Sequence, residues 1–139
     1  MIIPEIMLKI KIISPGKIKE AYLAEALAEY EKRLKGTASI EWVFKDIIPD
    51  SPYICLDPKG KTFTSPAFST FLYAEWEKCA SRLTFVIGGP EGLSQEILSG
   101  ARHTISLSPL TFTHQFARLI LLEQIYRAIQ IEKGSPYHK

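Results

Sequence analysis

The chain has 139 residues, 46% of them hydrophobic and 23% charged, with a formal net charge of +2 and two cysteines. This size and composition predict one globular domain over residues 1–139, whose core needs no metal or disulfide. No apolar run approaches the roughly 20 residues that cross a bilayer, the N-terminus is too short and acidic for a signal peptide, and no His or Cys stands at zinc spacing from either cysteine. We therefore expect a cytoplasmic protein with no membrane segment and no metal site. The small positive charge permits a nucleic-acid partner without demanding one.

Pro and Gly separate the elements of the N-terminal half. Residues 7–13 alternate apolar and basic side chains, which predicts a strand with one exposed face, and Ser14-Pro15-Gly16 ends it. Apolar residues recur at helical spacing through residues 17–35, and Gly36 is placed to end that helix. Further strands are predicted at residues 40–44 and 53–56, followed by a turn at 57–60.

The C-terminal half continues the alternation of helix and strand. A helix is predicted from Ser65, as N-cap, with Pro66 at its first position, to about Cys79. The remaining predicted elements are a buried strand at 83–87, a short helix capped by Ser94, a strand at 104–107 and a helix at 115–132. This regular alternation predicts an α/β fold with a mainly parallel sheet. The last helix has almost no polar face, so we expect it to be buried on more than one side, with a second subunit as its cover.

Three segments follow predicted strands and should converge, because ligands of open α/β sheets bind beyond the carboxyl ends of the strands. They are Leu56-Asp57, the glycine turn Gly88-Gly89-Pro90-Glu91-Gly92, and residues 107–112. The glycine turn has neither dinucleotide-fingerprint nor phosphate-loop spacing, and Glu91 would repel a phosphate. A simple strand-to-helix turn is the alternative. A ligand at this turn should carry hydroxyls, an amine or a cation.

Basic side chains near the last helix are further candidates. His114 and Arg118 lie one turn apart and can share a face, where His114 either satisfies the helix terminus or takes part in chemistry. Arg118, like Arg127, is a long cation on an apolar helix and should pair with a phosphate or a carboxylate. The tail at residues 134–139, taken alone, is typical of a frayed end.

Several segments together resemble one family. They are residues 15–17, 28–34, 86–93, 107–108, 111–115, Arg118, 123–128 and 136–139. In this order and spacing they resemble the SPOUT-class ribosomal RNA large-subunit pseudouridine N3-methyltransferases, the RlmH family, over nearly the whole chain. The resemblance implies an S-adenosylmethionine-dependent homodimer that methylates N3 of a pseudouridine in large-subunit ribosomal RNA, within the ribosome.

The resemblance also implies a C-terminal trefoil knot at about 83–139, one of the few exceptions to the rule against threaded chains. The cofactor contacts carried over to this sequence are Leu56, Gly88, Gly89, Leu107, Ser108, Pro109, Leu110, Thr111 and Phe112. The catalytic residues on the substrate side are His114, Arg118, Tyr137 and His138, with one subunit completing the site of the other.

This sequence departs from the family pattern in three places. Thr113 stands where the family usually has proline, which should loosen the loop before His114. The segment 45–52 is much shorter than its counterpart in the family, where a helix joins the second and third strands. This connection is therefore nearly extended, or the strands pair differently. The family usually begins near Met7, which makes residues 1–6 an extension or a misassigned start.

Two other functions are compatible with these residues. One is an RNA- or ribosome-binding module that kept the fold and lost catalysis, and its motivation is the missing helix. The other is a small α/β protein that binds a different adenosine-containing ligand at the glycine turn.

Overall fold

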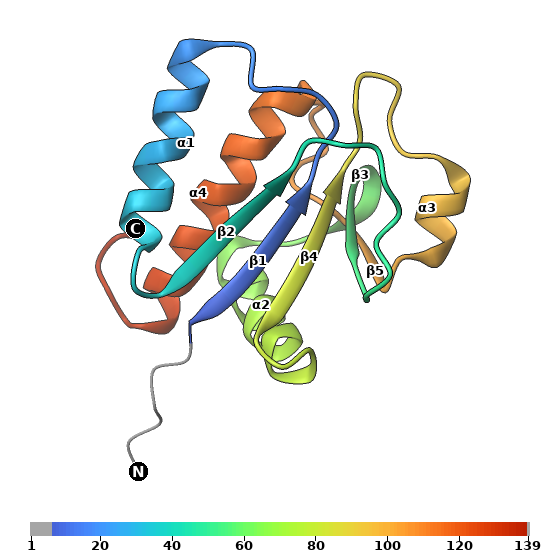
Figure 1. The fold of residues 1–139 in the computed structure, drawn as a ribbon. Helices are drawn as coiled ribbons and strands as arrows, with labels where there is room; N and C mark the ends of the chain where they lie inside the picture. Colours follow the sequence, from blue (N-terminus) through green and yellow to red (C-terminus); the bar gives the residue numbers. More distant parts are fainter. Residues whose placement is uncertain (1–6, 139) are drawn as a thin grey trace.

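The computed structural model describes residues 7–138, and residues 1–6, where the uncertainty about the start falls, lie outside this range. Five parallel strands form one sheet in the order β2-β1-β4-β3-β5 (Figure 1). The elements are β1 (Leu8–Ile13), α1 (Ala21–Leu34), β2 (Ala38–Val43), β3 (Ile54–Thr62), α2 (Ser65–Lys78), β4 (Arg82–Ile87), α3 (Gln95–Gly100), β5 (His103–Ser106) and α4 (His114–Glu132). The predicted α/β fold with a parallel sheet is confirmed.

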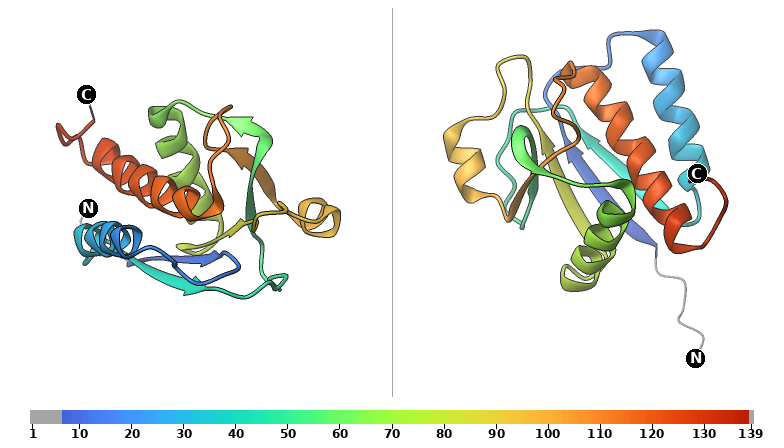
Figure 2. Two further views of the ribbon diagram at one scale, coloured as in Figure 1. Left: turned by 90° about the horizontal axis from the view of Figure 1, so that it is seen from above. Right: turned by 180° about the vertical axis from the view of Figure 1, so that it is seen from behind.

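The helices are divided unequally between the two faces of the sheet. Helices α1, α4 and α2 cover one face, while α3 lies on the opposite side near β3 and β5 (Figure 2). The larger core lies beneath α1, α4 and α2, and includes Ile10, Ile12 and Phe85 from the strands. A smaller core packs Ile97 of α3 against Val86. Alternate residues of β4 therefore enter different cores, as the pleat of a strand requires.

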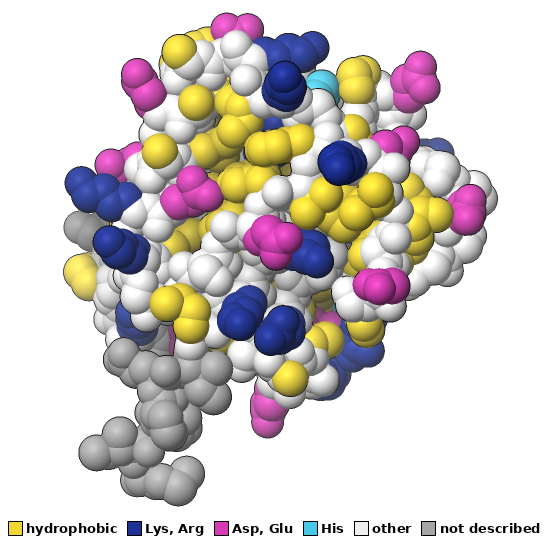
Figure 3. Space-filling model, in the orientation of Figure 1, with side chains coloured by type: hydrophobic (Ala, Val, Ile, Leu, Met, Phe, Trp, Pro, Cys, Tyr) yellow, Lys and Arg dark blue, Asp and Glu magenta, His cyan; other side chains and the backbone are white. Residues whose placement is uncertain are grey.

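The face of β1 away from these three helices is polar. Ile10 and Ile12 are buried, whereas Lys9 is exposed and Lys11 is half-buried. Basic, acidic and apolar side chains are interspersed over this face of the molecule (Figure 3). Parallel sheets are usually covered by helices on both faces and have nearly continuous apolar strands. The alternation in β1 correctly predicted that one of its faces is open.

The connection from β2 to β3 contains no helix. It starts at the end of β2, at one edge of the sheet, and reaches β3 on the far side of β1 and β4. Ile54, the first residue of β3, pairs with Phe85 in the second half of β4, so the chain does not have to return to the amino ends of the strands. Of the two possibilities, a nearly extended connection is therefore the one observed.

Most sides of α4 are covered within the chain. Its buried residues include Leu121, Leu122 and Ile125, and it packs against both α1 and α2 as well as the sheet. Neighbouring helices of the same chain thus account for much of its apolar composition, and a second subunit as the cover of its remaining side chains, such as the exposed Phe116, stays a prediction. A dimer needs a separate argument.

The predicted turn at residues 57–60 is part of β3. A local turn does exist, because the Asp57 carboxylate accepts a hydrogen bond from Lys59 N at 2.9 Å. The chain then pairs with β5 again at Lys61 and Thr62, after a shift of register. A Cβ on Gly60 would lie 2.6 Å from the backbone carbon of Ile105, so only glycine lets the irregular segment approach β5 this closely.

Two helix starts also differ from prediction. The N-cap of α2 is Thr64, whose hydroxyl accepts from Ala67 N at 3.2 Å, and not Ser65, whose hydroxyl instead donates to Gln124 Oε1 at 2.9 Å. Helix α1 begins at Ala21 and not at Lys17. The carbonyl of Lys17 accepts a hydrogen bond from the Gln115 side chain at 3.0 Å, which holds this segment against α4.

Candidate active site

The three segments predicted to converge do so, at the carboxyl ends of β3, β4 and β5. They enclose a hollow of about 200 Å³. Its lining consists of Leu56, Asp57, Pro58, Ile87, Gly88, Gly89, Pro90, Gly92, Leu93, Ser106, Leu107, Ser108, Leu110, Thr111, Phe112, His114 and Ala117. Pro109 is the one residue of the predicted cofactor set that does not line it. The remaining eight are brought together, and their binding of a cofactor stays a prediction.

The glycine turn folds back on itself at the carboxyl end of β4. Gly92 N donates to the Gly89 carbonyl at 2.9 Å, which closes a turn with Pro90 in its second position and glycine in its fourth, both favoured there. A Cβ on Gly88 would lie 2.7 Å from the backbone carbon of Gly92. Glu91 does not line this hollow but a second one of about 490 Å³, which shares the glycine turn with the first and extends to Ile13 and Pro15.

The segment between β5 and α4 is held by its own side chains. Ser106 Oγ donates to the Ser108 carbonyl at 2.8 Å, and Ser108 Oγ accepts from Leu110 N at 3.0 Å. Thr113 Oγ1 accepts from Phe116 N at 3.3 Å and is the N-cap of α4. Threonine in place of the family's proline therefore caps the helix, and the expected loosening of the loop stays a prediction.

His114 is the one predicted catalytic residue that lines the hollow. Since Thr113 caps α4, capping does not explain the imidazole. Burial, together with the positive charges of Arg118 and Lys19, holds the pKa of His114 below its ordinary value. The ring is therefore neutral at physiological pH and is able to accept a hydrogen bond.

Arg118 is fully buried and does not reach the hollow. Its guanidinium donates to the backbone carbonyls of Ser14, Pro15 and Gly16 at 3.1, 3.0 and 2.6 Å. It also donates to Ser14 Oγ at 2.8 Å and to Gln115 Oε1 at 3.3 Å. The expectation of a phosphate or carboxylate partner is therefore wrong, because carbonyl oxygens at the end of β1 occupy the available donors.

Arg118 and Gln115 together fix the loop between β1 and α1. Gln115 donates to the Lys17 carbonyl, directly after the three carbonyls that Arg118 binds. Lys17 and Lys19 are exposed on this loop. The first turn of α4 thus holds the loop that carries both lysines, and the charge of Lys19 acts on His114.

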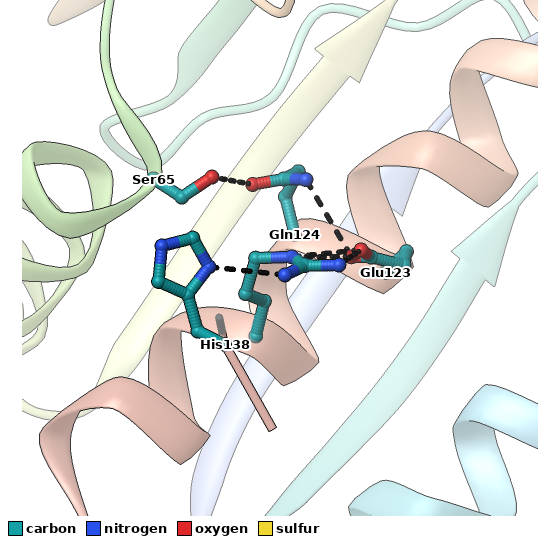
Figure 4. Close-up of polar contacts among 5 residues, drawn as sticks. Ser65, Glu123, Gln124 and His138 are labelled. Atoms are coloured by element: carbon teal, nitrogen blue, oxygen red, sulfur yellow. Dashed lines mark hydrogen bonds and ion pairs between the residues drawn. The ribbon is translucent and has the colours of Figure 1, made fainter. Parts of the chain in front are cut away.

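The C-terminal tail folds back along α4. Tyr137 packs edge-on against Tyr126, with ring centroids 4.8 Å apart, and the Arg127 guanidinium lies over the Tyr137 ring at 5.0 Å. Arg127 Nη1 lies 3.0 Å from His138 Nδ1 (Figure 4). Burial and a hydrogen bond with Tyr30 raise the pKa of Tyr137, so its phenol is protonated near neutral pH.

Within one chain the tail and the hollow are separate. Neither Tyr137 nor His138 lines the hollow. Arg127, which contacts His138, follows His114 by about 20 Å along the helix axis at about 1.5 Å per residue. The four predicted catalytic residues are thus divided into His114 at the hollow, Arg118 behind it, and Tyr137 with His138 farther along α4.

A family model described as a predicted SPOUT methyltransferase matches residues 39–138. A protein from Protochlamydia amoebophila named ribosomal RNA large subunit methyltransferase H is 52% identical over 143 residues, which are 96% of this chain and all of the relative. A protein of the same name from Carboxydothermus hydrogenoformans is 40% identical over 159 residues, covering 95% of this chain and all of the relative. The chain belongs to this family of SPOUT methyltransferases.

Solved structures agree with the SPOUT fold. A putative methylase family protein from Neisseria gonorrhoeae has a TM-score of 0.58 at 10% identity, over all of this chain and 89% of that one. A probable methylase family protein from Haemophilus influenzae has a TM-score of 0.57 at 10% identity, over 94% of this chain and 70% of that one. At this identity the likeness concerns the fold alone.

Among residues 7–138 of this SPOUT chain, no helix is long and apolar enough to cross a membrane. In the same range no three His, Cys, Asp or Glu side chains are grouped so that they could hold a metal ion.

One residue that lines the hollow, Ala117, was not predicted from the sequence, whereas Asp57 belongs to a segment that was expected there. Arg127 binds the Glu123 carboxylate, a kind of partner that was expected, but its contact with the tail of this SPOUT methyltransferase was not. Glu123 stands four residues before Arg127, a spacing at which opposite charges pair on a helix, and that signal identifies the pair. The role of Ser14 as a partner of Arg118, by contrast, could not be predicted from its side chain, because its backbone carbonyl accepts one of the two hydrogen bonds.

Proposed function

We propose that this SPOUT methyltransferase transfers a methyl group from S-adenosylmethionine to N3 of a pseudouridine in large-subunit ribosomal RNA, as a cytoplasmic homodimer acting on the ribosome. The observation that carries the proposal is the hollow at the carboxyl ends of β3, β4 and β5, lined by the glycine turn and residues 107–112. The relatives named ribosomal RNA large subunit methyltransferase H support the choice of RNA.

The lining of the hollow fits this cofactor chemically. Its residues include no Lys or Arg, so it lacks the cations that hold a phosphate chain. Leu56, Leu107 and Phe112 give apolar contacts, and the Asp57 carboxylate can accept from hydroxyl or amino groups. A nucleoside that carries a sulfonium and no phosphate meets these conditions. When bound, it supplies an electrophilic methyl group.

The chain must supply orientation and a suitable electrostatic setting for the acceptor base. N3 of pseudouridine bears a proton whose pKa lies above neutral, so the site must remove that proton or favour the anion. A cationic donor and an anionic acceptor lose their charges together, which an apolar site favours. We propose that His114 acts beside the cofactor in the hollow, and that Tyr137 and His138 contact the pseudouridine base. Arg118 acts through the loop from Ser14 to Gly16.

Separation of the tail from the hollow supports a site shared between two subunits. Large apolar side chains are exposed near the mouth of the hollow: Tyr22 is 58% exposed, Phe116 42% and Leu110 72%. Tyr22 and Phe116 come from α1 and α4 and lie 6.4 Å apart between ring centroids. We place the dimer contact on this surface, so that the tail of one subunit reaches the hollow of the other. The C-terminal knot at 83–139 belongs to the same proposal.

Recognition of RNA should depend on shape and a few local cations. Lys17 and Lys19 are exposed on the loop that Arg118 and Gln115 hold, and Lys9 and Lys11 lie on the open face of the sheet. Four cations on a chain of net charge +2 do not form a broad basic surface. We therefore expect ribosomes to be much better substrates than an isolated RNA hairpin, and equal methylation of both would contradict this part of the proposal.

The first test measures binding and transfer separately. Titration calorimetry should detect S-adenosylmethionine and S-adenosylhomocysteine at micromolar concentration. Ribosomes from a strain that lacks the gene, incubated with the protein, should yield N3-methylpseudouridine on nucleoside mass spectrometry. Removal of residues 137–139 should abolish methylation and leave cofactor binding intact.

The same measurements separate the alternatives. Absence of micromolar binding of either ligand would end the methyltransferase proposal and favour a different adenosine-containing ligand. Ribosome binding without methylation by the full chain would favour the inactive module. Undiminished methylation by the truncated protein would remove the tail from the site.

A further inference from the structure

The tail histidine is the last member of a continuous chain of hydrogen bonds. Ser65 at the start of α2 donates to Gln124, and Gln124 Nε2 lies 3.5 Å from a Glu123 carboxylate oxygen (Figure 4). Glu123 accepts from Arg127 Nε at 2.9 and 3.2 Å, and also from its Nη2. Arg127 Nη1 then contacts His138 Nδ1 at 3.0 Å. The His138 ring is thus oriented by residues of two helices.

The partners in this chain determine which ring nitrogen carries hydrogen. A guanidinium only donates hydrogen bonds, so His138 Nδ1 must accept through its lone pair. A neutral imidazole has one N–H, which is consequently on Nε2. In a doubly protonated ring, an N–H at Nδ1 would face the N–H of Arg127. No hydrogen bond to His138 Nε2 is formed among residues 7–138, and Figure 4 shows this nitrogen on the side of the His138 ring away from the dashed line that marks the contact of Nδ1.

From this geometry we propose that His138 is a hydrogen-bond donor to the substrate base through Nε2–H, and not the general base. Glu123 and Arg127 are positioning residues that fix its tautomer. This inference rests on the proposed function for the identity of the base, whereas the tautomer itself depends only on the contacts of the chain.

The donor role gives His138 a defined place in the reaction. The N3 proton goes to water or a buffer base, and its electron pair stays on the ring, delocalised over N3 and the flanking carbonyl oxygens. Nε2–H of His138 donates to one of these oxygens and stabilises the anion. The electron pair on N3 forms the bond to the methyl group, and the bond from that methyl group to sulfur breaks with its electrons remaining on sulfur.

The other titratable groups around the tail fit this role. Arg127 and Glu123 face His138 from α4, and α2 presents the hydroxyl of Ser65. Tyr137, beside His138 in the tail, packs on Tyr126 and lies close to Tyr30 of α1. Its protonated phenol is not a base near neutral pH. None of these groups displaces Arg127 from Nδ1.

Nuclear magnetic resonance of the full-length, ¹⁵N-labelled protein tests the tautomer without any substrate. The chain has three histidines, so the His138 signals are those lost in His138→Gln. A long-range ¹H–¹⁵N spectrum near neutral pH should show a protonated Nε2 and an unprotonated Nδ1 at His138. In Glu123→Gln, which weakens the hold on Arg127, the second tautomer should become populated. Glu132→Gln, the same change on the same helix, should leave the spectrum as in the wild type. A protonated Nδ1 in the wild-type protein would overturn the proposal.

Methylation rates test the donor role. The amide of Gln can donate from about the position of Nε2 but cannot take up a proton, so His138→Gln should keep the rate within about tenfold of wild type, while His138→Ala should lose roughly 10²–10³-fold. Glu123→Gln should lose roughly tenfold, as expected for an orienting partner, and Glu132→Gln nothing. Equal losses for the Gln and Ala variants of His138 would identify a base and overturn the proposal. A wild-type protein that binds no cofactor and methylates no ribosome would refute the proposed function instead, and the tautomer spectrum would still decide the geometry.

Discussion

Gly88 and Gly89 are adjacent in one turn but differ in what a side chain would meet. A Cβ on Gly88 would lie 2.7 Å from backbone of the returning chain, whereas a Cβ on Gly89 would have no atom within 4 Å. We predict that Gly88→Ala lowers the free energy of unfolding by about 1–3 kcal/mol, because the turn must open. Chemical denaturation measures this change.

Gly89→Ala is the matched control for the turn and also reports on the ligand. Its free energy of unfolding should equal that of the wild type. If S-adenosylmethionine lies against the turn as proposed, calorimetry should show weaker binding to Gly89→Ala despite the intact fold. Unchanged affinity would place the ligand away from Gly89, and equal stability of the two variants would contradict the packing at Gly88.

Among the elements, α4 is tied to the end of β1 by a single side chain. The Arg118 guanidinium binds five acceptor atoms of Ser14, Pro15, Gly16 and Gln115, and the Phe44 ring lies 5.1 Å from its central carbon. Burial lowers the pKa of Arg118, but the group remains charged at any physiological pH. Its hydrogen bonds therefore need the planar, forked guanidinium more than a positive charge.

We predict that Arg118→Lys destabilises the protein by about 3 kcal/mol or more, because one ammonium cannot satisfy these buried carbonyls. Denaturation by urea gives the value. Cofactor affinity should fall less than the rate of methylation, since the loop from Ser14 to Gly16 does not line the hollow. Arg82→Lys, at the exposed first residue of β4, should leave stability unchanged. A folded, equally stable Arg118→Lys protein would show that the loop does not depend on these bonds.

What could be predicted from the sequence differs between elements for physical reasons. Strands and helices could be predicted from the spacing of apolar residues and from the Pro and Gly residues between them. Convergence of the carboxyl ends of the strands follows from parallel pairing. The cap of α2 was assigned to the wrong residue, because the Ser65 hydroxyl donates to Gln124, 59 residues away, and Thr64 is the N-cap. The partners of Arg118 were missed because backbone carbonyls have no sequence signature. The spacing of Glu123 and Arg127 indicates their pairing, but their contact with the tail depends on a fold-back along α4 that the sequence does not indicate.

For the whole molecule, the decisive question is whether two chains share each site. Two variants separate the halves of the proposed site: Thr111→Trp, whose indole can fill the hollow, and His138→Ala, which removes the tail donor. Each should be nearly inactive alone. Calorimetry should confirm that the first has lost the cofactor and the second has kept it.

Mixing the two variants should restore activity if the tail of one subunit serves the hollow of the other. A mixed dimer then has one site with both halves intact, so random exchange should return roughly a quarter of the wild-type rate. A mixture of His138→Ala with Tyr137→Phe/His138→Ala should return nothing, since both tails are defective. Native mass spectrometry must show that mixed dimers have formed. If they have formed and the first mixture stays inactive, each site is built within a single chain and the shared-site proposal is wrong.

Phe116→Asp should prevent the exchange itself, because it places a charge in the exposed apolar surface assigned to the dimer contact.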